Sequence, residues 1–200
     1  MKRWILITLA GSAAVLVLAA CATSRAGYES APYTVVRSEG AFEVRDYPAL
    51  ATASTAMDPS GAERDDRFMR LFRYIDGGNE ASQKVAITTP VFMSGPAAGG
   101  AGDRASTMAF VLPKDVAAAG APAPRSSQVV LQTMPARRVA VVRFSGVTNR
   151  QRDESKLNEL KAWAQKENLT IEGDPFFAYY DPPWTPGPLR RNEALVPVKK

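Results

Sequence analysis

The chain contains no histidine and a single cysteine, Cys21, which restricts the chemistry that its side chains can perform. Without histidine, Ser-His-Asp triads, Cys-His pairs, HExxH zinc helices and histidine-ligated haem are excluded. Asp65 and Asp66 form an acidic pair of a kind that solvated surfaces often carry. The glycine-rich stretch at 95–102 lacks the spacing of a phosphate-binding loop. We therefore predict a binding protein rather than an enzyme.

Three side chains on one predicted helix form the best candidate binding surface. Met69 and Arg73 are four residues apart and share a stripe, with Phe72 beside it. Methionine and phenylalanine offer a soft wall to a flat apolar ligand, and a guanidinium binds carboxylates at the edge of such a ligand. The alternative is that Met69 and Phe72 belong to the core and that Arg73 is only a solvated surface residue.

The helix that positions this stripe is predicted over about residues 61–76. Phe68, Leu71 and Ile75 recur at helical spacing, so they form an apolar face that can pack on a sheet. Gly77 opens a Gly-Gly-Asn sequence and is expected to end the helix in the left-handed conformation.

Alternating and β-branched residues predict strands on both sides of this helix. The first series comprises strands at 33–37, 42–45, 50–57, 85–93 and 107–112, and the second comprises strands at 128–134 and 138–144, a helix at 148–166, and strands at 176–180 and 193–198. Pro90 should confine its strand to a sheet edge or a bend. Stretches rich in Gly, Ala and Pro at 95–106 and 117–126 are predicted to be surface loops.

The second series repeats the apolar pattern of the first. A shift of 89 residues aligns Leu71 with Leu160 and Tyr74 with Trp163. The repeat lies in apolar character rather than in identical residues, so chance similarity is the alternative to an internal duplication. Antiparallel strands with helices on one face are typical of an α+β fold.

A set of short motifs, in this order along the chain, resembles the signature of the SOUL haem-binding family. The motifs are FEVRDY at 42–47, FMRLFRYIDGGN at 68–79, KVAITTPV at 84–91, FVLP at 110–113, VVRFSG at 141–146, YDPPW at 180–184 and RRNE at 190–193. The match covers residues 33–198, which we expect to form one domain. The resemblance implies an α+β fold, with a pseudo-duplicated, twisted antiparallel sheet or distorted β-barrel and two helices packed on it.

The resemblance also implies a tetrapyrrole ligand, held non-covalently against the helix and the loop that begins at Tyr180. Met69, Phe72, Arg73 and Tyr180 are then the expected haem-binding residues. Family members bind haem through an axial histidine or through apolar contact, and only apolar contact is open to a chain without histidine. Methionine and tyrosine can also ligate haem iron. The spacing selects none of Met69, Met93, Met108 and Tyr180 for that role.

The N-terminal segment has the features of a bacterial lipoprotein leader. Lys2 and Arg3 precede an uncharged run at 4–20, which is at the short limit for a membrane span. The sequence LAAC, which ends at Cys21, resembles a lipobox, and this implies cleavage after residue 20 and acylation of Cys21. Two or more acyl chains would hold the protein stably at a membrane. The alternative is an uncleaved signal anchor with an incidental cysteine.

These features divide the chain into a leader at 1–20, an acylated cysteine with its tether at 21–32, and the domain at 33–198. If the host is Gram-negative, Ala22 lacks the aspartate associated with inner-membrane retention, so the periplasmic face of the outer membrane is expected. The formal net charge is +5 and the basic residues are scattered, so no nucleic-acid partner is expected.

Three functions of different classes fit these observations. The first is a lipid-anchored envelope protein that binds haem or another tetrapyrrole for capture, buffering or transfer. The second is a structural or interaction lipoprotein that keeps the fold without the ligand. The third is an enzyme acting on a porphyrin or another amphiphile, for which the sequence shows no nucleophile or base.

Overall fold

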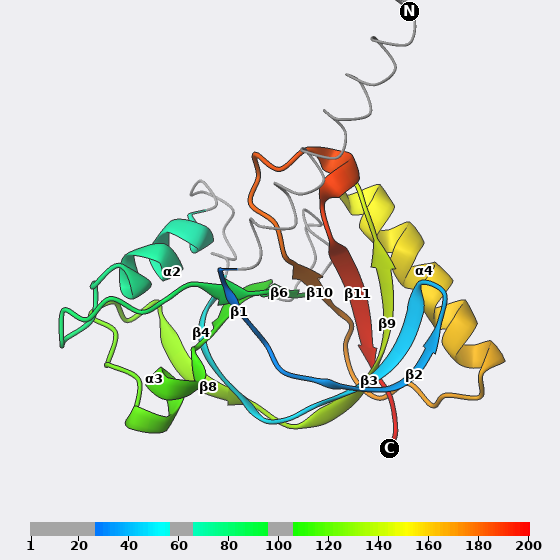
Figure 1. Cartoon of the computed structure of the whole chain (residues 1–200), viewed down its shortest axis with the longest axis horizontal. Helices are drawn as coiled ribbons and strands as arrows, with labels where there is room; N and C mark the ends of the chain where they lie inside the picture. Colours follow the sequence, from blue (N-terminus) through cyan, green and yellow to red (C-terminus); the bar gives the residue numbers. More distant parts are fainter. Residues whose placement is uncertain (1–26, 57–65, 96–105) are drawn as a thin grey trace, which may run out of the picture.

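The computed structural model describes residues 27–56, 66–95 and 106–200, and its main element is a nine-stranded antiparallel sheet that curls into a half-barrel (Figure 1). The strands are β2 (Thr34–Glu39), β3 (Phe42–Tyr47), β4 (Leu50–Ala56), β6 (Val91–Ser94), β7 (Thr107–Val111), β8 (Val130–Met134), β9 (Arg137–Phe144), β10 (Phe176–Tyr179) and β11 (Asn192–Pro197). From edge to edge their order is β2-β3-β9-β11-β10-β6-β7-β4-β8. The predicted α+β class with a twisted antiparallel sheet is confirmed.

Several predicted features fall on parts of the chain that the structure does not describe. The leader, Cys21 and the first part of the tether lie outside the described residues, as do residues 61–65 of the predicted helix and most of the predicted loop at 95–106. Within the described part of the chain, no helix is long and apolar enough to cross a membrane.

The sheet is built from two similar halves that exchange their first strands. The order β9-β11-β10 in one half mirrors the order β4-β7-β6 in the other, and the halves meet where β10 pairs with β6. β3 precedes β4 in the chain but pairs with β9, whereas β8 precedes β9 but pairs with β4. Neither half therefore completes its sheet without the other, as an internally repeated fold allows.

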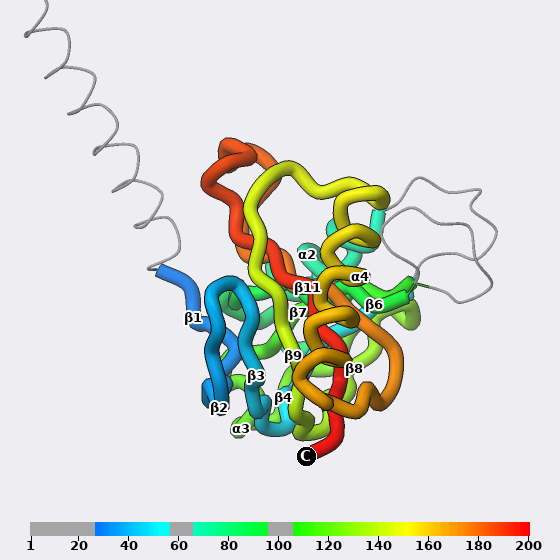
Figure 2. Tube along the Cα trace, turned by 90° about the vertical axis from the view of Figure 1, so that its right-hand side faces the viewer, coloured from blue at the N-terminus to red at the C-terminus, as the bar shows by residue number. Residues whose placement is uncertain are grey.

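The outer face of the sheet carries one helix on each half (Figure 1). α2 (Arg67–Ile75) packs against β4 and β7, and α4 (Arg150–Lys166) packs against β9 and β11. Figure 2, in which the half with α4 faces the viewer, shows this helix in front beside β9, with β2 and β3 to the left. The residue pairs that the repeat aligns are buried at equivalent places, namely Leu71 with Leu160 and Tyr74 with Trp163. The apolar spacing thus predicted these buried positions in both helices.

The predicted apolar face of α2 is partly wrong, because Phe68 is 47% exposed while Arg67 and Arg70 are buried. Arg70 donates a hydrogen bond to Thr55 Oγ1 (3.1 Å) near the end of β4. Arg67 donates to the Ser106 carbonyl (3.3 Å) just before β7. Because acceptors on and beside the sheet bind both guanidinium groups, the helix turns its arginines inward and leaves Phe68 partly exposed, edge to face with buried Phe110 (ring centroids 5.7 Å apart).

The Gly-Gly-Asn sequence ends α2 as predicted. Gly77 has a φ of +101°, in the region that favours glycine. Asn79 is fully buried, and its Nδ2 donates to the Tyr74 carbonyl (3.0 Å). Gly78 packs so closely that a Cβ at this position would lie 2.5 Å from the Arg73 carbonyl oxygen. The turn therefore fixes the end of α2 through contacts that need these small residues.

Two other predicted segments differ from the structure. The strand at 85–93 is divided at Pro90, whose peptide bond with Thr89 is cis, into β5 (Thr88–Thr89) and β6. β5 pairs in parallel with β1 (Glu29–Ser30), so Pro90 marks a bend between two strands. The loop predicted at 117–126 begins instead with the end of helix α3 (Lys114–Ala119). Alanine favours helix strongly, and buried Val116 anchors this turn to the core.

Candidate functional site

α2 brings together three of the four residues predicted to contact a ligand. Met69 is 44% exposed, Arg73 is exposed, and Phe72 is partly buried. Phe68, which faces outward, adds its ring to this surface with its centroid 6.1 Å from that of Phe72. We call these four side chains the α2 surface. It is an apolar surface with a guanidinium beside it.

The cavity beside Arg73 is small. Its volume is about 110 Å³, and its lining includes the polar side chains of Asp66, Arg70 and Gln128. Pockets for small molecules usually measure about 300–1,000 Å³. A flat ligand at the α2 surface would therefore contact the helix through one face and one edge of its ring, and it would not be enclosed in a pocket there.

Tyr180 lies apart from the α2 surface, on the inner face of the sheet. Its side chain packs in the inner core and is 7% exposed, and its hydroxyl donates to Glu193 Oε2 (2.9 Å). Since α2 covers the outer face, the sheet stands between Tyr180 and Met69. The residues predicted to form one site are thus divided between two faces of the sheet.

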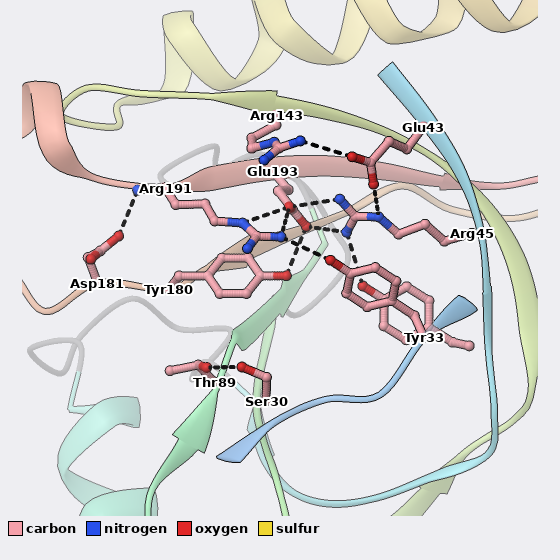
Figure 3. Close-up of polar contacts among 11 residues, drawn as sticks. Ser30, Tyr33, Glu43, Arg45, Thr89, Arg143, Tyr180, Asp181, Arg191 and Glu193 are labelled. Atoms are coloured by element: carbon pink, nitrogen blue, oxygen red, sulfur yellow. Dashed lines mark hydrogen bonds and ion pairs between the residues drawn. The ribbon is translucent and has the colours of Figure 1, made fainter. Parts of the chain in front are cut away.

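Tyr180 belongs to a buried ionic network centred on Glu193 (Figure 3). Arg45 donates from Nη1 to Glu193 Oε2 (2.7 Å) and from Nη2 to Oε1 (3.0 Å). Arg191 donates from Nη2 to Glu193 Oε1 (2.6 Å), while Arg45 Nε donates to Glu43 Oε2 (2.6 Å). Two-point pairing of this kind is the stronger form of a charged hydrogen bond. It lets Arg45 and Glu193 remain charged although both are fully buried.

The groups of the network stabilise one another's charge states. Burial alone would raise the pKa of Glu193, but the hydrogen bond and charge of Arg45, followed by those of Arg191, lower it below its ordinary value. Burial raises the pKa of Tyr47 to about 12. Burial and the negative Glu193 also raise the pKa of Tyr180. At neutral pH Glu193 is ionised and both tyrosines are protonated, so these groups join strands rather than transfer protons.

The same network fixes the N-terminal segment across the inner face (Figure 3). The guanidinium carbon of Arg45 lies 4.2 Å from the centre of the Tyr33 ring, and Arg191 donates to the Tyr33 hydroxyl (3.3 Å). Ser30 and Thr89 share a hydrogen bond of 3.0 Å where β1 meets β5. These contacts tie the last residues of the predicted tether and the first residues of the domain to the sheet.

No local motif of the sequence indicates this network. Arg45 lies in the motif FEVRDY and Glu193 in the motif RRNE, and the two residues are 148 positions apart. A single sequence does not reveal that residues so far apart are paired. The presence of a charged residue at an inward position of a buried strand was the one available signal, because such residues need partners.

A larger cavity opens on the inner face of the sheet. Its volume is about 820 Å³, and strands β4, β6, β7, β8, β9 and β10 all contribute lining residues. We call it the inner cavity. Its lining includes the aromatic rings of Phe92 and Phe176 and the side chain of Arg137. Sequence reasoning missed it because curvature of the sheet, and not any local motif, brings these strands together.

The loop that follows Tyr180 exposes a tryptophan. Trp184 is 84% exposed, the largest exposure among the exposed large apolar side chains of the described residues. Arg190 holds the loop by donating to the carbonyls of Thr185 (2.8 Å) and Pro183. The loop is therefore shaped by its own hydrogen bonds while its indole faces solvent.

Several solved structures share this fold. A hydrolase from Listeria innocua aligns with a TM-score of 0.58 at 14% identity, covering 82% of this chain and 94% of that chain. The C-terminal domain of EcmrR aligns with a TM-score of 0.54 at 14% identity, covering 84% and 98%. EcmrR in its DNA complex aligns with a TM-score of 0.57 at 13% identity, covering 80% of this chain but only 57% of that chain. At these identities the likeness concerns the fold alone.

Sequence comparison gives a family. No curated protein sequence matches the chain. The family model described as SOUL heme-binding protein matches residues 28–197, which include every strand and helix named above. This range agrees with the span of the motifs quoted from the sequence. The chain therefore belongs to the SOUL heme-binding protein family.

Proposed function

We propose that the protein is a lipid-anchored envelope protein that binds haem or a related tetrapyrrole for capture, buffering or transfer. Membership of the SOUL family suggests the tetrapyrrole ligand. The observation that carries the site is the α2 surface, where Phe68 and Met69 are both more than two-fifths exposed beside an exposed Arg73.

The α2 surface offers a flat ligand both apolar contact and a charge. A porphyrin ring laid on Phe68 and Met69 would remove their apolar area from water, which contributes about 25 cal/mol per Å². Met69 is flexible and polarisable, so it can adapt to the ring. Arg73 follows Met69 by one helical turn, so a propionate at the ring edge would meet its guanidinium.

The structure also separates the residues that could ligate haem iron. Met93 and Met108 are partly buried and pack against core clusters, and the Tyr180 hydroxyl is engaged with Glu193. Met69 is exposed on the α2 surface. If iron is ligated at this surface, Met69 is the residue that we propose for it.

A haem titration of the purified protein tests the proposed ligand and its site. We expect a Soret shift that saturates near one equivalent. Arg73→Glu should weaken binding about ten- to a hundredfold, because a charge-assisted pair of about 1.5–3 kcal/mol becomes a repulsion, and the loss should be larger at low salt. Met69→Asp should weaken binding by placing a charge on the apolar wall.

A matched control separates the site from a general charge effect. Lys161→Glu makes a similar charge reversal at an exposed position of α4, on the other half of the sheet, and should leave the titration unchanged. If Arg73→Glu lowers the melting temperature and leaves haem binding intact, Arg73 is a structural residue. A titration without saturation would favour a lipoprotein that keeps the fold for another interaction.

The proposed lipid anchor is tested separately at Cys21. Cys21→Ser removes the only thiol of the chain, and with it the acylation site. We expect the variant to leave the membrane fraction or to accumulate as an unprocessed precursor, because no acyl chain then holds it to the bilayer. Fractionation and intact-protein mass measure this outcome. Unchanged mass and unchanged partitioning would contradict the anchor without bearing on haem binding.

A further inference from the structure

The inner cavity has an apolar floor. Phe92 and Phe176 lie edge to face with their ring centroids 5.5 Å apart, and the partly buried Met134 packs against the same core cluster. The volume of about 820 Å³ lies within the usual range of about 300–1,000 Å³ for pockets that bind small molecules. The cavity is therefore large enough for a ligand with a substantial apolar part.

Arg137 lines this cavity, and its positive charge is not paired with a carboxylate of the described residues. Its guanidinium carbon lies 5.7 Å from the centre of the Phe176 ring, and its Nε donates to the Pro135 carbonyl (3.3 Å). The neighbouring Arg138 instead binds Asp46 through two hydrogen bonds of 2.9 Å. No carboxylate in the described parts of the chain lies within ion-pair distance of Arg137.

The half-buried Arg137 therefore has unused donors in a poorly solvated place. Burial lowers the pKa of Arg137, which shows that its surroundings disfavour the charge. An arginine nevertheless stays protonated in proteins and carries five N–H donors. A ligand carboxylate beside Phe176 would supply the missing negative charge and accept hydrogen bonds from two of these N–H groups.

The other charged residues of the cavity lining are of both signs. Glu172 and Asp174 are acidic, and Arg138 and Lys200 are basic. Arg138 is already paired with Asp46, whereas the guanidinium of Arg137 lies beside the Phe176 ring. A single carboxylate next to the apolar floor would therefore meet Arg137.

We propose that the inner cavity binds a long-chain monocarboxylate, with its apolar chain on Phe92 and Phe176 and its carboxylate at Arg137. This site is on the opposite face of the sheet from the α2 surface. It does not depend on tetrapyrrole binding, and it uses a different ligand class. Occupancy would place an amphiphile inside the half-barrel while the α2 surface stays open.

Calorimetric titration with palmitate tests the proposal, with Cys21→Ser as the background so that no attached lipid competes. We expect saturable binding of one palmitate per chain. Hexadecanol has the same chain length without the charge and should bind at least about tenfold more weakly, because a hydrogen-bonded ion pair contributes more than a neutral contact. Hexadecyltrimethylammonium should bind more weakly still.

Two variants locate the binding. Arg137→Gln should lower the affinity for palmitate about tenfold or more and leave that for hexadecanol unchanged. Gln132→Trp places a large ring at an exposed position of the cavity lining and should weaken both ligands without overpacking the core. Arg143→Gln removes an arginine from the same strand outside the cavity lining, and should change neither affinity.

Three results would overturn the proposal. The first is the absence of saturable palmitate binding by protein with an unchanged melting temperature. The second is an equal loss of palmitate and hexadecanol affinity in Arg137→Gln, which would make Arg137 a structural residue. The third is displacement of palmitate by one equivalent of haem, which would make the inner cavity the tetrapyrrole site. A haem titration that fails while palmitate binds would count against the proposed function alone.

Discussion

Arg45 and Glu193 show how single residues in this fold tolerate deep burial of charge. Both are fully buried, and their side chains are joined by two hydrogen bonds of 2.7 and 3.0 Å. Removing one partner of such a pair typically costs about 3–5 kcal/mol, because the other charge stays buried. The two residues come from β3 and β11, which flank β9 in the sheet. Their types could be read from the sequence, but their pairing depends on a strand order that the sequence does not state.

Gly78 should be the most sensitive glycine of the turn after α2. A Cβ at Gly78 would lie 2.5 Å from the Arg73 carbonyl oxygen, a backbone atom that cannot rotate away. We expect Gly78→Ala to lower the free energy of unfolding by about 1–3 kcal/mol through overpacking. Gly77→Val should cost about 1 kcal/mol or more, because valine strains at positive φ. Urea unfolding measures both changes.

Gly27→Ala is the control for these two substitutions. Gly27 has no positive φ and no heavy atom within 4 Å of the added Cβ. Its replacement should therefore leave the free energy of unfolding nearly unchanged. If Gly78→Ala is as mild as Gly27→Ala, the turn relaxes more easily than its geometry indicates.

At the scale of elements, periodicity predicted most of the strands and both large helices. Periodicity failed where charged side chains are buried or a large apolar side chain is exposed. Arg67 and Arg70 are buried because long arginine stems can lie under a helix while their guanidinium groups reach strand-end acceptors. An apolar pattern assigns such residues to solvent, and it assigned Phe68 to the core although 47% of this residue is exposed. Helix α3 was missed because it is only six residues long.

The two halves of the sheet should respond alike to the same substitution in their helices. Leu71 in α2 and Leu160 in α4 are both fully buried, and they belong to different core clusters. We expect Leu71→Ala and Leu160→Ala each to lower the free energy of unfolding by about 2–5 kcal/mol. The double variant should be additive within about 0.5 kcal/mol, because the two sites share no partner.

The exposed position Met69 gives the comparison for this experiment. Met69→Ala should change the free energy of unfolding by no more than about 0.5 kcal/mol, since Met69 is exposed and belongs to no core cluster of the described residues. If Leu160→Ala lowers the free energy of unfolding much less than Leu71→Ala does, the two halves are alike in topology but not in packing.

For the whole molecule, stability should depend on pH through carboxyl groups with shifted pKa values. The hydrogen bond from Arg138 lowers the pKa of Asp46, and the arginines around Glu193 lower that of Glu193 despite its burial. A lowered native pKa adds stability above the unfolded-state values of about 3.9 for Asp and 4.3 for Glu, and this stability is lost as the pH falls through the native values.

Asp153 acts in the opposite direction. Burial raises its pKa, against the hydrogen bond from the Tyr179 hydroxyl (2.9 Å) and the charge of Arg152. Its Oδ1 is buried and has no hydrogen-bond partner within the described residues. The native state therefore holds this proton more tightly than the unfolded state. The stability that results is present at low pH and is lost as the pH rises above about 3.9.

Asp153→Asn tests this assignment because asparagine does not titrate. The stability of the variant relative to the unsubstituted protein should rise between about pH 3 and about pH 7, since only the unsubstituted protein must ionise a buried carboxyl group over that range. Urea unfolding at several pH values measures the difference. A difference that stays constant with pH would show that Asp153 ionises in the native state as readily as in the unfolded chain.

The two proposed binding surfaces also differ in how far the sequence could predict them. The α2 surface arises within one helix, so the spacing of Met69 and Arg73 was enough to bring them together. The inner cavity exists only when strands from both halves curl around it, and its residues run from Thr52 to Lys200. Prediction from one sequence therefore reached the local surface and not the enclosed one.

The position of β11 has a consequence for when the protein can fold. β11 is the last strand in the chain, yet it lies between β9 and β10 in the middle of the sheet. A nascent chain can pair β2 with β3 and β6 with β7 as these strands emerge, but it cannot join β9 to β10 until residues 192–197 have been synthesised. The nine-stranded sheet becomes continuous only when this late strand is in place between its two neighbours.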